Sequence, residues 1–191
     1  EVMRDSCHFM NIPNILTLLR IALIPILVIL YYLPFGWVNI ACGIVFAVAC
    51  FTDWLDGYLA RMLDQNTRLG AFLDPVADKL IVAVALVMLC VTYASPWITI
   101  PAIIIICREI VISALREWMA ELGKRSNVKV SYVGKVKTAM QMLSILVLLS
   151  VDKDHWFSWA GIIALYIAAV LTIWSMFIYL SAAWSDLKKH S

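Results

Sequence analysis

The stretch DWLDGYLARMLDQNTRLGAFLDPVADK, residues Asp53–Lys79, carries five aspartates in a chain of 191 residues that is 63% hydrophobic. Asp53 and Asp56 are three residues apart, and Asp74 and Asp78 are four apart, so each pair lies on one face of a helix. The segment between the pairs is short, which makes the ends of the two helices neighbours. We therefore expect the four carboxylates to converge on one spot.

Four converging carboxylates repel one another unless a positive charge lies between them. Oxygen ligands without a nearby His or Cys favour Mg²⁺ or Mn²⁺ over Zn²⁺. Four such ligands can hold two ions, the arrangement that clamps a transferring phosphoryl group. The sequence therefore predicts a site for two divalent ions. The alternative is a set of surface aspartates or helix N-caps, and Asp64, which fits that alternative, is left out of the site.

Small residues accompany the acidic ones. Gly57 and Ala60 are three residues apart beside Asp56, and they leave a strip of backbone that a planar ligand can approach closely. Gly70 comes just before the second pair of aspartates. Close packing between helices explains the same small residues, and their spacing does not decide between ligand and packing.

The rest of the chain consists of long uncharged runs. No Asp, Glu, Lys or Arg occurs in residues 21–52, 80–107, 138–151 and 156–185. A helix of about 20 apolar residues crosses the hydrocarbon core, where backbone groups have to be paired within the segment. The turn signals LPFGW and ASPW divide the first two runs. We predict an all-α integral membrane protein with six transmembrane helices, at residues 14–33, 37–62, 71–93, 97–121, 131–151 and 156–184.

The cations predict the orientation. With the N-terminus inside, the inner segments carry eleven Lys or Arg residues, and the outer loops carry only Lys153. This asymmetry satisfies the positive-inside rule, so both termini and the aspartates are expected on the cytoplasmic side. Residues 1–10 match no pattern and are interpreted as an extension or tag remnant before a single six-helix catalytic domain at residues 11–187.

The aspartate stretch resembles DxxDGxxARx₈GxxxDxxxD, the signature of the CDP-alcohol phosphotransferase family. The matching residues are Asp53, Asp56, Gly57, Ala60, Arg61, Gly70, Asp74 and Asp78. The resemblance implies the family's six-helix fold and transfer of a phosphatidyl group from CDP-diacylglycerol to an alcohol, with release of CMP. It also implies that the four aspartates bind two divalent metals and that Asp78 deprotonates the alcohol. The nucleotide site it implies comprises Asp56, Gly57, Ala60, Arg61 and Gly70.

Cations elsewhere suggest how an acceptor is held. Arg108 falls near mid-membrane and Arg116 nearer the inner surface, and a deep ionisable residue indicates a functional site. Lys135 and Lys137 are two residues apart and cannot share a face. Arg116 with one of these lysines would suit an acceptor that carries a phosphate. The alternatives are a structural ion pair of Arg108 or Glu109 with another helix, and lysines that reach towards lipid headgroups.

Three polar residues occupy the inner end of the first expected helix. Asn14, Thr17 and Arg20 have i, i+3, i+6 spacing and share one side. By resemblance they border the binding pocket, Asn14 and Thr17 beside the nucleotide and Arg20 beside the acceptor phosphate. Capping or packing is an equal alternative for Asn14.

The segment CREIVISALREWMAELGKRSNVKVSYVGKVKTAMQM, residues 107–142, is similar to bacterial family members that use sn-glycerol 3-phosphate. The similarity implies phosphatidylglycerophosphate as product, a bacterial inner membrane as location, a homodimer among membrane lipids, and no nucleic-acid partner. Inositol phosphate, serine and phosphatidylglycerol stay open as acceptors. A membrane prenyltransferase and a cation transporter are the alternatives from other classes.

Overall fold

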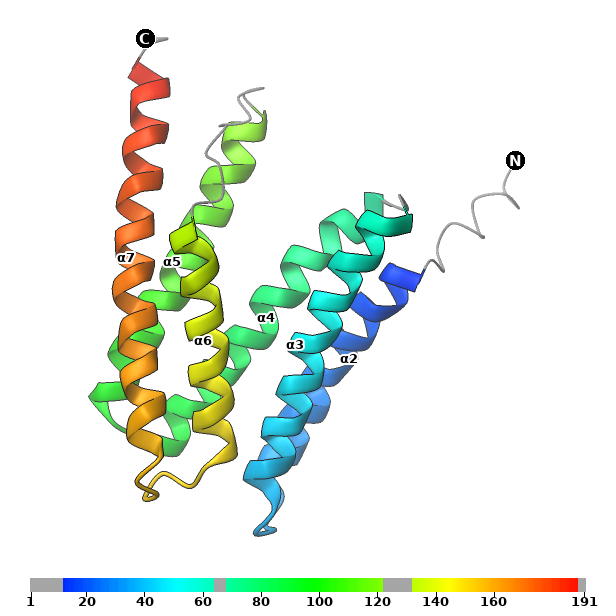
Figure 1. The fold of residues 1–191 in the computed structure, drawn as a ribbon, viewed down its shortest axis with the longest axis vertical. Helices are drawn as coiled ribbons and strands as arrows, with labels where there is room; N and C mark the ends of the chain where they lie inside the picture. Colours follow the sequence, from blue (N-terminus) through cyan, green and yellow to red (C-terminus); the bar gives the residue numbers. More distant parts are fainter. Residues whose placement is uncertain (1–11, 64–67, 122–131, 189–191) are drawn as a thin grey trace. The chain divides into compact units, whose positions relative to one another are not determined.

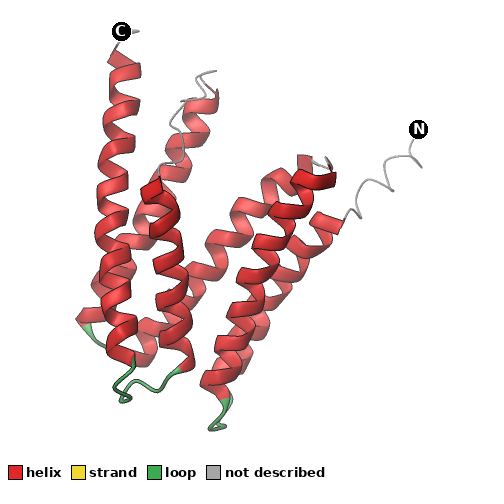
Figure 2. Ribbon diagram, viewed as in Figure 1, coloured by secondary structure: helices red, strands yellow, loops and turns green. Residues whose placement is uncertain are grey.

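The computed structural model describes residues 12–63, 68–121 and 132–188, and all regular secondary structure in these ranges is α-helical (Figure 2). The helices are α2 (Ile12–Tyr31), α3 (Val38–Leu63), α4 (Arg68–Tyr93), α5 (Pro96–Glu121), α6 (Tyr132–Ser150) and α7 (Ser158–Lys188), shown in Figure 1. Each predicted segment coincides with one of these helices. The all-α prediction is therefore confirmed for the described residues.

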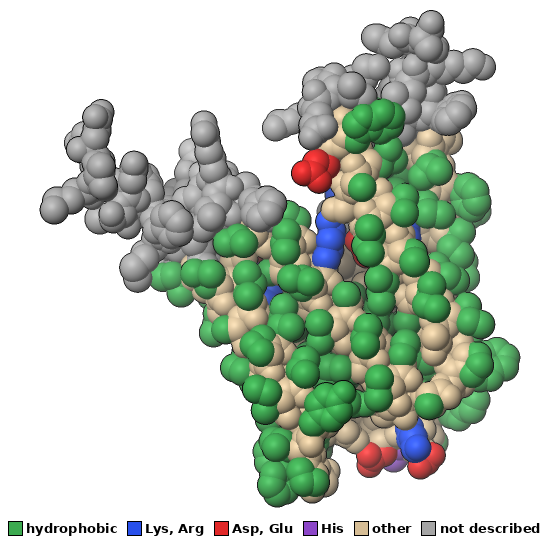
Figure 3. Space-filling model, turned by 180° about the vertical axis from the view of Figure 1, so that it is seen from behind, with side chains coloured by type: hydrophobic (Ala, Val, Ile, Leu, Met, Phe, Trp, Pro, Cys, Tyr) green, Lys and Arg blue, Asp and Glu red, His purple; other side chains and the backbone are tan. Residues whose placement is uncertain are grey.

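Four of the helices contain segments that are long and apolar enough to cross a membrane, namely Val38–Leu59, Pro75–Tyr93, Pro96–Met119 and Ser158–Ser181. Within the described residues, α2 and α6 contribute the shorter apolar segments Ile15–Tyr31 and Val136–Ser150. Large hydrophobic side chains lie on the outside, with Trp97 70% and Phe177 67% exposed, and hydrophobic side chains predominate in Figure 3. Such a surface is that of a membrane protein, because water does not tolerate apolar patches of this extent.

The contacts divide the chain into two compact units. Of the described residues, the first unit comprises 12–63, 68–88 and 149–152, and in it α2 packs against α3. Leu27, Phe46 and Leu86 are among its fully buried side chains. The Tyr31 hydroxyl donates a hydrogen bond to the Met88 carbonyl over 3.3 Å, which ties α2 to α4.

The second unit comprises the described residues 89–121, 132–148 and 153–188, and in it α5 packs against α7. Helices α6 and α7 also approach closely. The Ser144 hydroxyl donates to the Gly161 carbonyl over 2.8 Å, and a Cβ atom at Gly161 would lie only 2.7 Å from Cγ of Leu148. Glycine is required here because any side chain would push the two helices apart.

The turn between α4 and α5 lies where the ASPW signal predicts it. Ala94 adopts the left-handed region with φ of 43°, and its N–H donates to the Cys90 carbonyl over 3.0 Å, which ends α4. Pro96 then occupies the first position of α5, where a missing N–H costs no hydrogen bond. The Ser95 carbonyl accepts the first bonds of the new helix from Ile98 and Thr99, both at 3.1 Å.

Candidate functional site

The first unit brings two of the predicted metal-binding aspartates to one guanidinium group. Asp53 and Asp56 lie on one face of α3, as their i, i+3 spacing requires, and Arg20 reaches them from α2. Nη1 of Arg20 lies 3.0 Å from Oδ1 of Asp53, and Nη2 donates to Oδ2 of Asp56. Arg20 and Asp56 are buried, while 39% of the Asp53 side chain is exposed. Two carboxylates therefore share one cation beside a partly open edge.

The second aspartate pair belongs to α4. The thiol of Cys50 in α3 lies within electrostatic range of Asp53, Asp78 and Arg20, so Asp78 belongs to the same region of the first unit. Asp74 precedes Asp78 by one helical turn, and its side chain lies outside the described part of the structure. Among the described side chains, no three of His, Cys, Asp or Glu come close enough to hold a metal ion. The two-ion site stays a prediction.

The predicted nucleotide residues flank the aspartate pair along the chain. Thr17 is fully buried in α2, one turn before Arg20. Gly57 directly follows Asp56, and a Cβ atom at Gly57 would meet no described heavy atom within 4 Å. Asn14, Ala60, Arg61 and Gly70 belong to helices α2, α3 and α4, with side chains outside the described part. The open space at Gly57 is what close approach of a ligand needs.

The second unit holds a separate group of cations around one glutamate. Nζ of Lys137 in α6 donates to Oε1 of Glu109 in α5, and Nη1 of Arg108 donates to the same oxygen over 3.0 Å. Lys137 is buried, so its side chain does not extend towards headgroups. Glu109 thus forms an ion pair with another helix, which is one of the alternatives that the sequence analysis left open. We call Arg108, Glu109, Arg116 and Lys137 the α5–α6 charge cluster.

Helix α7 supplies two polar partners that the sequence did not suggest. Nη2 of Arg108 donates to the Ser175 hydroxyl over 2.9 Å. Nε of Arg116 donates to the Tyr179 hydroxyl over 3.1 Å, and its Cζ lies 5.1 Å from the ring centroid. Ser175 and Tyr179 are four residues apart, hence on one face of α7. In the sequence, the four-residue spacing of these two polar residues inside an uncharged run was the signal that could have indicated a polar face on α7.

The charge cluster has an excess of positive charge. Arg108 and Lys137 both contact the carboxylate of Glu109, and Lys137 lies within electrostatic range of Arg108 and of Arg116 as well. Arg116 is exposed, whereas Lys137 is buried. The side chain of Lys135 lies outside the described part. Arg116 is thus the member of the cluster that an anion from outside can reach directly.

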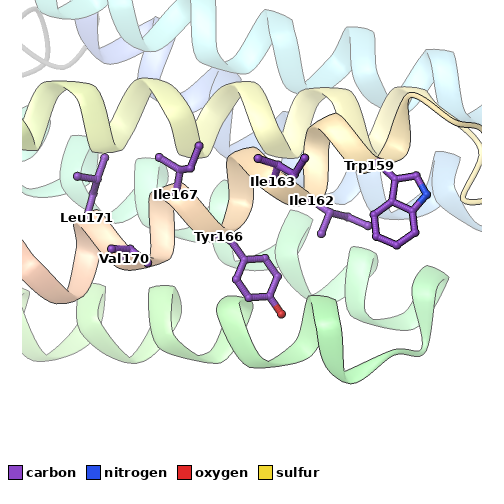
Figure 4. Close-up of a pocket in the computed structure, with 7 residues that line it drawn as sticks. All are labelled: Trp159, Ile162, Ile163, Tyr166, Ile167, Val170 and Leu171. Atoms are coloured by element: carbon purple, nitrogen blue, oxygen red, sulfur yellow. The ribbon is translucent and has the colours of Figure 1, made fainter.

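A groove of about 420 Å³ follows the N-terminal half of α7 (Figure 4). Its lining is entirely hydrophobic or aromatic and consists of Trp159, Ile162, Ile163, Tyr166, Ile167, Val170 and Leu171. None of these seven residues is charged. The charged side chains described above belong instead to the aspartate region and the charge cluster.

With these two sites described, comparison with known proteins places the chain. It belongs to the CDP-alcohol phosphatidyltransferase family, whose profile matches residues 10–174. A relative from Yersinia pestis (strain Pestoides F) is 61% identical over 178 residues, which cover 93% of this chain and 97% of the relative. One from Sodalis glossinidius is 58% identical, covering 95% and 99%. One from Salmonella choleraesuis is 56% identical, covering 93% and 97%. All three are named CDP-diacylglycerol–glycerol-3-phosphate 3-phosphatidyltransferase.

Proposed function

We propose that this chain transfers the phosphatidyl group of CDP-diacylglycerol to sn-glycerol 3-phosphate, giving phosphatidylglycerophosphate and CMP. The observation that carries the proposal is the complete aspartate signature, from Asp53 to Asp78, in a chain 56–61% identical to relatives named for this reaction. The reaction belongs to phospholipid biosynthesis and suits a protein with a hydrophobic exterior, because both the donor and the product are lipids.

The donor side of the reaction is assigned to the first unit. Asp53, Asp56, Asp74 and Asp78 would hold Mg²⁺ or Mn²⁺, as two ions. The shared contact of Asp53 and Asp56 with one guanidinium fits this role, since it shows that their oxygens can meet on one cation. Bound divalent ions would neutralise the pyrophosphate and stabilise CMP as leaving group.

Asp78 is proposed as the base of the reaction. The acceptor hydroxyl has to lose its proton as it attacks the β-phosphorus, and a carboxylate can take it. Gly57 fits the nucleotide site because the space beside it is open. Asp56, Ala60, Arg61, Gly70, Asn14 and Thr17 are proposed to line the same nucleotide site.

The acceptor side is assigned to the second unit. Arg116 would contact the phosphate of glycerol 3-phosphate, since it is exposed and held by Tyr179. Arg108 and Lys137 both donate to Glu109, so they would contribute positive potential and orientation. Lys135 is proposed as a further phosphate contact. Inositol phosphate, serine or phosphatidylglycerol is the second candidate acceptor class, but serine has no phosphate that would require these cations.

We further propose that all six helices cross the inner membrane of a bacterium, with both termini and the aspartates at the cytoplasmic face. The supporting pattern is the eleven inner cations against one outer cation. Residues 11–187 would form one catalytic domain, surrounded by membrane lipids and paired as a homodimer.

A transfer assay tests the proposed function. Purified full-length protein in detergent is given CDP-diacylglycerol and radiolabelled glycerol 3-phosphate, with Mg²⁺, with Mn²⁺, or with a chelator. We expect lipid-soluble label and equimolar CMP with either metal, and neither product with the chelator. CMP release with inositol phosphate or serine but not with glycerol 3-phosphate would change the assigned acceptor. Ion flux in vesicles without CMP release would indicate a transporter.

A further inference from the structure

Arg20 has an environment that an arginine rarely occupies. Its side chain is 0% exposed and is the largest of the fully buried side chains in the described part of the protein. The helix around it, α2, is otherwise strongly apolar. Burying a guanidinium in such surroundings is costly unless opposite charges compensate it. The compensating charges are the carboxylates of Asp53 and Asp56.

Arg20 is held mainly by charge attraction and makes few directed hydrogen bonds. Nη2 hydrogen-bonds to Asp56, but Nε and Nη1 are buried without a hydrogen-bond partner among the described residues. Nη1 is near Asp53 without hydrogen-bond geometry. A salt bridge that served only to join α2 and α3 would satisfy its buried donors. Arg20 instead places positive charge between two carboxylates, at the point where the proposed function needs a cation.

We propose that Arg20 is an internal counter-cation of the Asp53–Asp56 pair. It keeps the two carboxylates aimed at one point without a divalent ion, and it lowers their affinity for that ion so that the ion can exchange. Arg20 is therefore a positioning residue. The family resemblance had implied that it lies beside the acceptor phosphate instead. This inference rests on the proposed metal-dependent function.

The contacts of Arg20 favour this role over phosphate binding. A phosphate at Arg20 would have to compete with two carboxylates of its own protein for the same guanidinium. In the charge cluster, Arg116 is less restricted. Its side chain is exposed, and no acidic side chain among the described contacts neutralises it.

The sign of the effect on metal affinity follows from magnitudes. Removing the guanidinium loosens Asp53 and Asp56, and loss of a group that orients metal ligands weakens binding by about 10–100-fold. The substitution also removes the repulsion between the guanidinium and a divalent ion held by the same carboxylates. At an effective dielectric constant of about 20, this repulsion is larger than the loss from misoriented ligands. The net result is tighter binding.

The experiment compares the full-length wild type with R20K and R20Q in detergent. Binding of Mn²⁺ is measured from the electron paramagnetic resonance signal of the free ion. We expect R20Q to bind Mn²⁺ at least about tenfold more tightly than wild type, because repulsion is lost. R20K keeps the charge and should stay within about threefold. Unchanged or weaker binding by R20Q overturns the proposal, as does an R20Q defect confined to the KM for glycerol 3-phosphate.

A metal-free measurement keeps the test valid if R20Q folds poorly. In EDTA we expect R20Q to melt at a lower temperature than wild type and the double variant R20Q/D56N to recover most of the loss, because it removes the opposing charge. A double variant as unstable as R20Q overturns the counter-cation role. If wild type binds no Mn²⁺ and forms labelled lipid in the presence of chelator, the proposed metal-dependent function fails. The melting temperatures in EDTA still test the counter-cation role of Arg20.

Discussion

Arg116 of α5 and Tyr179 of α7 form a hydrogen bond of 3.1 Å from Nε to the phenol oxygen, with Cζ 5.1 Å from the ring centroid. Both contacts act on one exposed guanidinium, so they restrict its orientation and lower the entropy lost on binding an anion. Because Nε is engaged, the two Nη groups are the donors that can form a fork to a phosphate.

Replacing Tyr179 tests this arrangement. Y179F removes the hydroxyl and keeps the ring, so we expect the KM for glycerol 3-phosphate to rise about 3–10-fold, as for loss of one typical hydrogen bond at an exposed site, with kcat little changed. Initial rates with radiolabelled acceptor measure both constants. Y166F, in the apolar groove of the same helix, is the matched control and should behave as wild type. A wild-type KM in Y179F would contradict the role of the hydroxyl.

The pair of Glu109 and Lys137 should dominate the stability of the second unit. E109Q leaves the buried Lys137 ammonium without its carboxylate, a change that costs about 3 kcal/mol or more for a buried pair. We expect a clearly lower melting temperature in detergent. E109Q/K137Q should recover much of the loss, because both charges leave together, yet should stay poorly active. A melting temperature of E109Q equal to wild type would show that the pair is solvated.

The close contact of α6 and α7 predicts that a substitution at Gly161 lowers the stability of the protein without changing substrate binding. G161A places a Cβ 2.7 Å from Cγ of Leu148, so the helices have to shift, at about 1–3 kcal/mol. We expect a lower melting temperature with an unchanged KM for both substrates. G36A is the control, since a Cβ at Gly36 would meet no described heavy atom within 4 Å. Equal melting temperatures for the two variants would contradict the close packing.

The helices could be predicted from the sequence because their causes are local. Uncharged runs and the ASPW turn mark α4 and α5 directly, and the aspartate spacing places Asp53 and Asp56 on one face. The partners of these residues could not be predicted. Arg20 and Asp56 are 36 residues apart, and Arg116 and Tyr179 are 63 apart, so their contacts depend on how helices pack. Spacing within one helix carries no information about its neighbour.

This difference explains why the contacts of Arg20 with Asp53 and Asp56 could not be predicted. Its i, i+3, i+6 relation to Asn14 and Thr17 shows a shared face of α2, which the sequence alone reads as the border of a pocket. Only the packing of α2 against α3 shows that this face meets the aspartate pair. The need for a positive charge between the carboxylates was predictable, but the protein's own contribution to that charge was not.

Asp78 can be tested as the base by an isosteric change. D78N keeps the size of the side chain but cannot accept the proton of the acceptor hydroxyl, so we expect kcat to fall by about 10²–10⁴-fold. Binding of CDP-diacylglycerol should be largely retained, as measured by titration of the purified variant. D154N, in the exposed loop after α6, is the control for removing one negative charge. Activity of D78N near wild type would remove Asp78 from the base role.

A substitution at Gly57 distinguishes ligand approach from helix packing as the reason for the small residues, because the two explanations predict opposite changes in melting temperature. A Cβ at Gly57 would meet no described heavy atom within 4 Å, so G57A should raise the melting temperature slightly, because alanine favours a helix by about 1 kcal/mol over glycine. If a nucleotide approaches the Gly57 backbone, the same methyl group should raise the KM for CDP-diacylglycerol about tenfold or more and leave the KM for glycerol 3-phosphate unchanged. Helix packing at Gly57 predicts the reverse, a lower melting temperature with donor affinity retained.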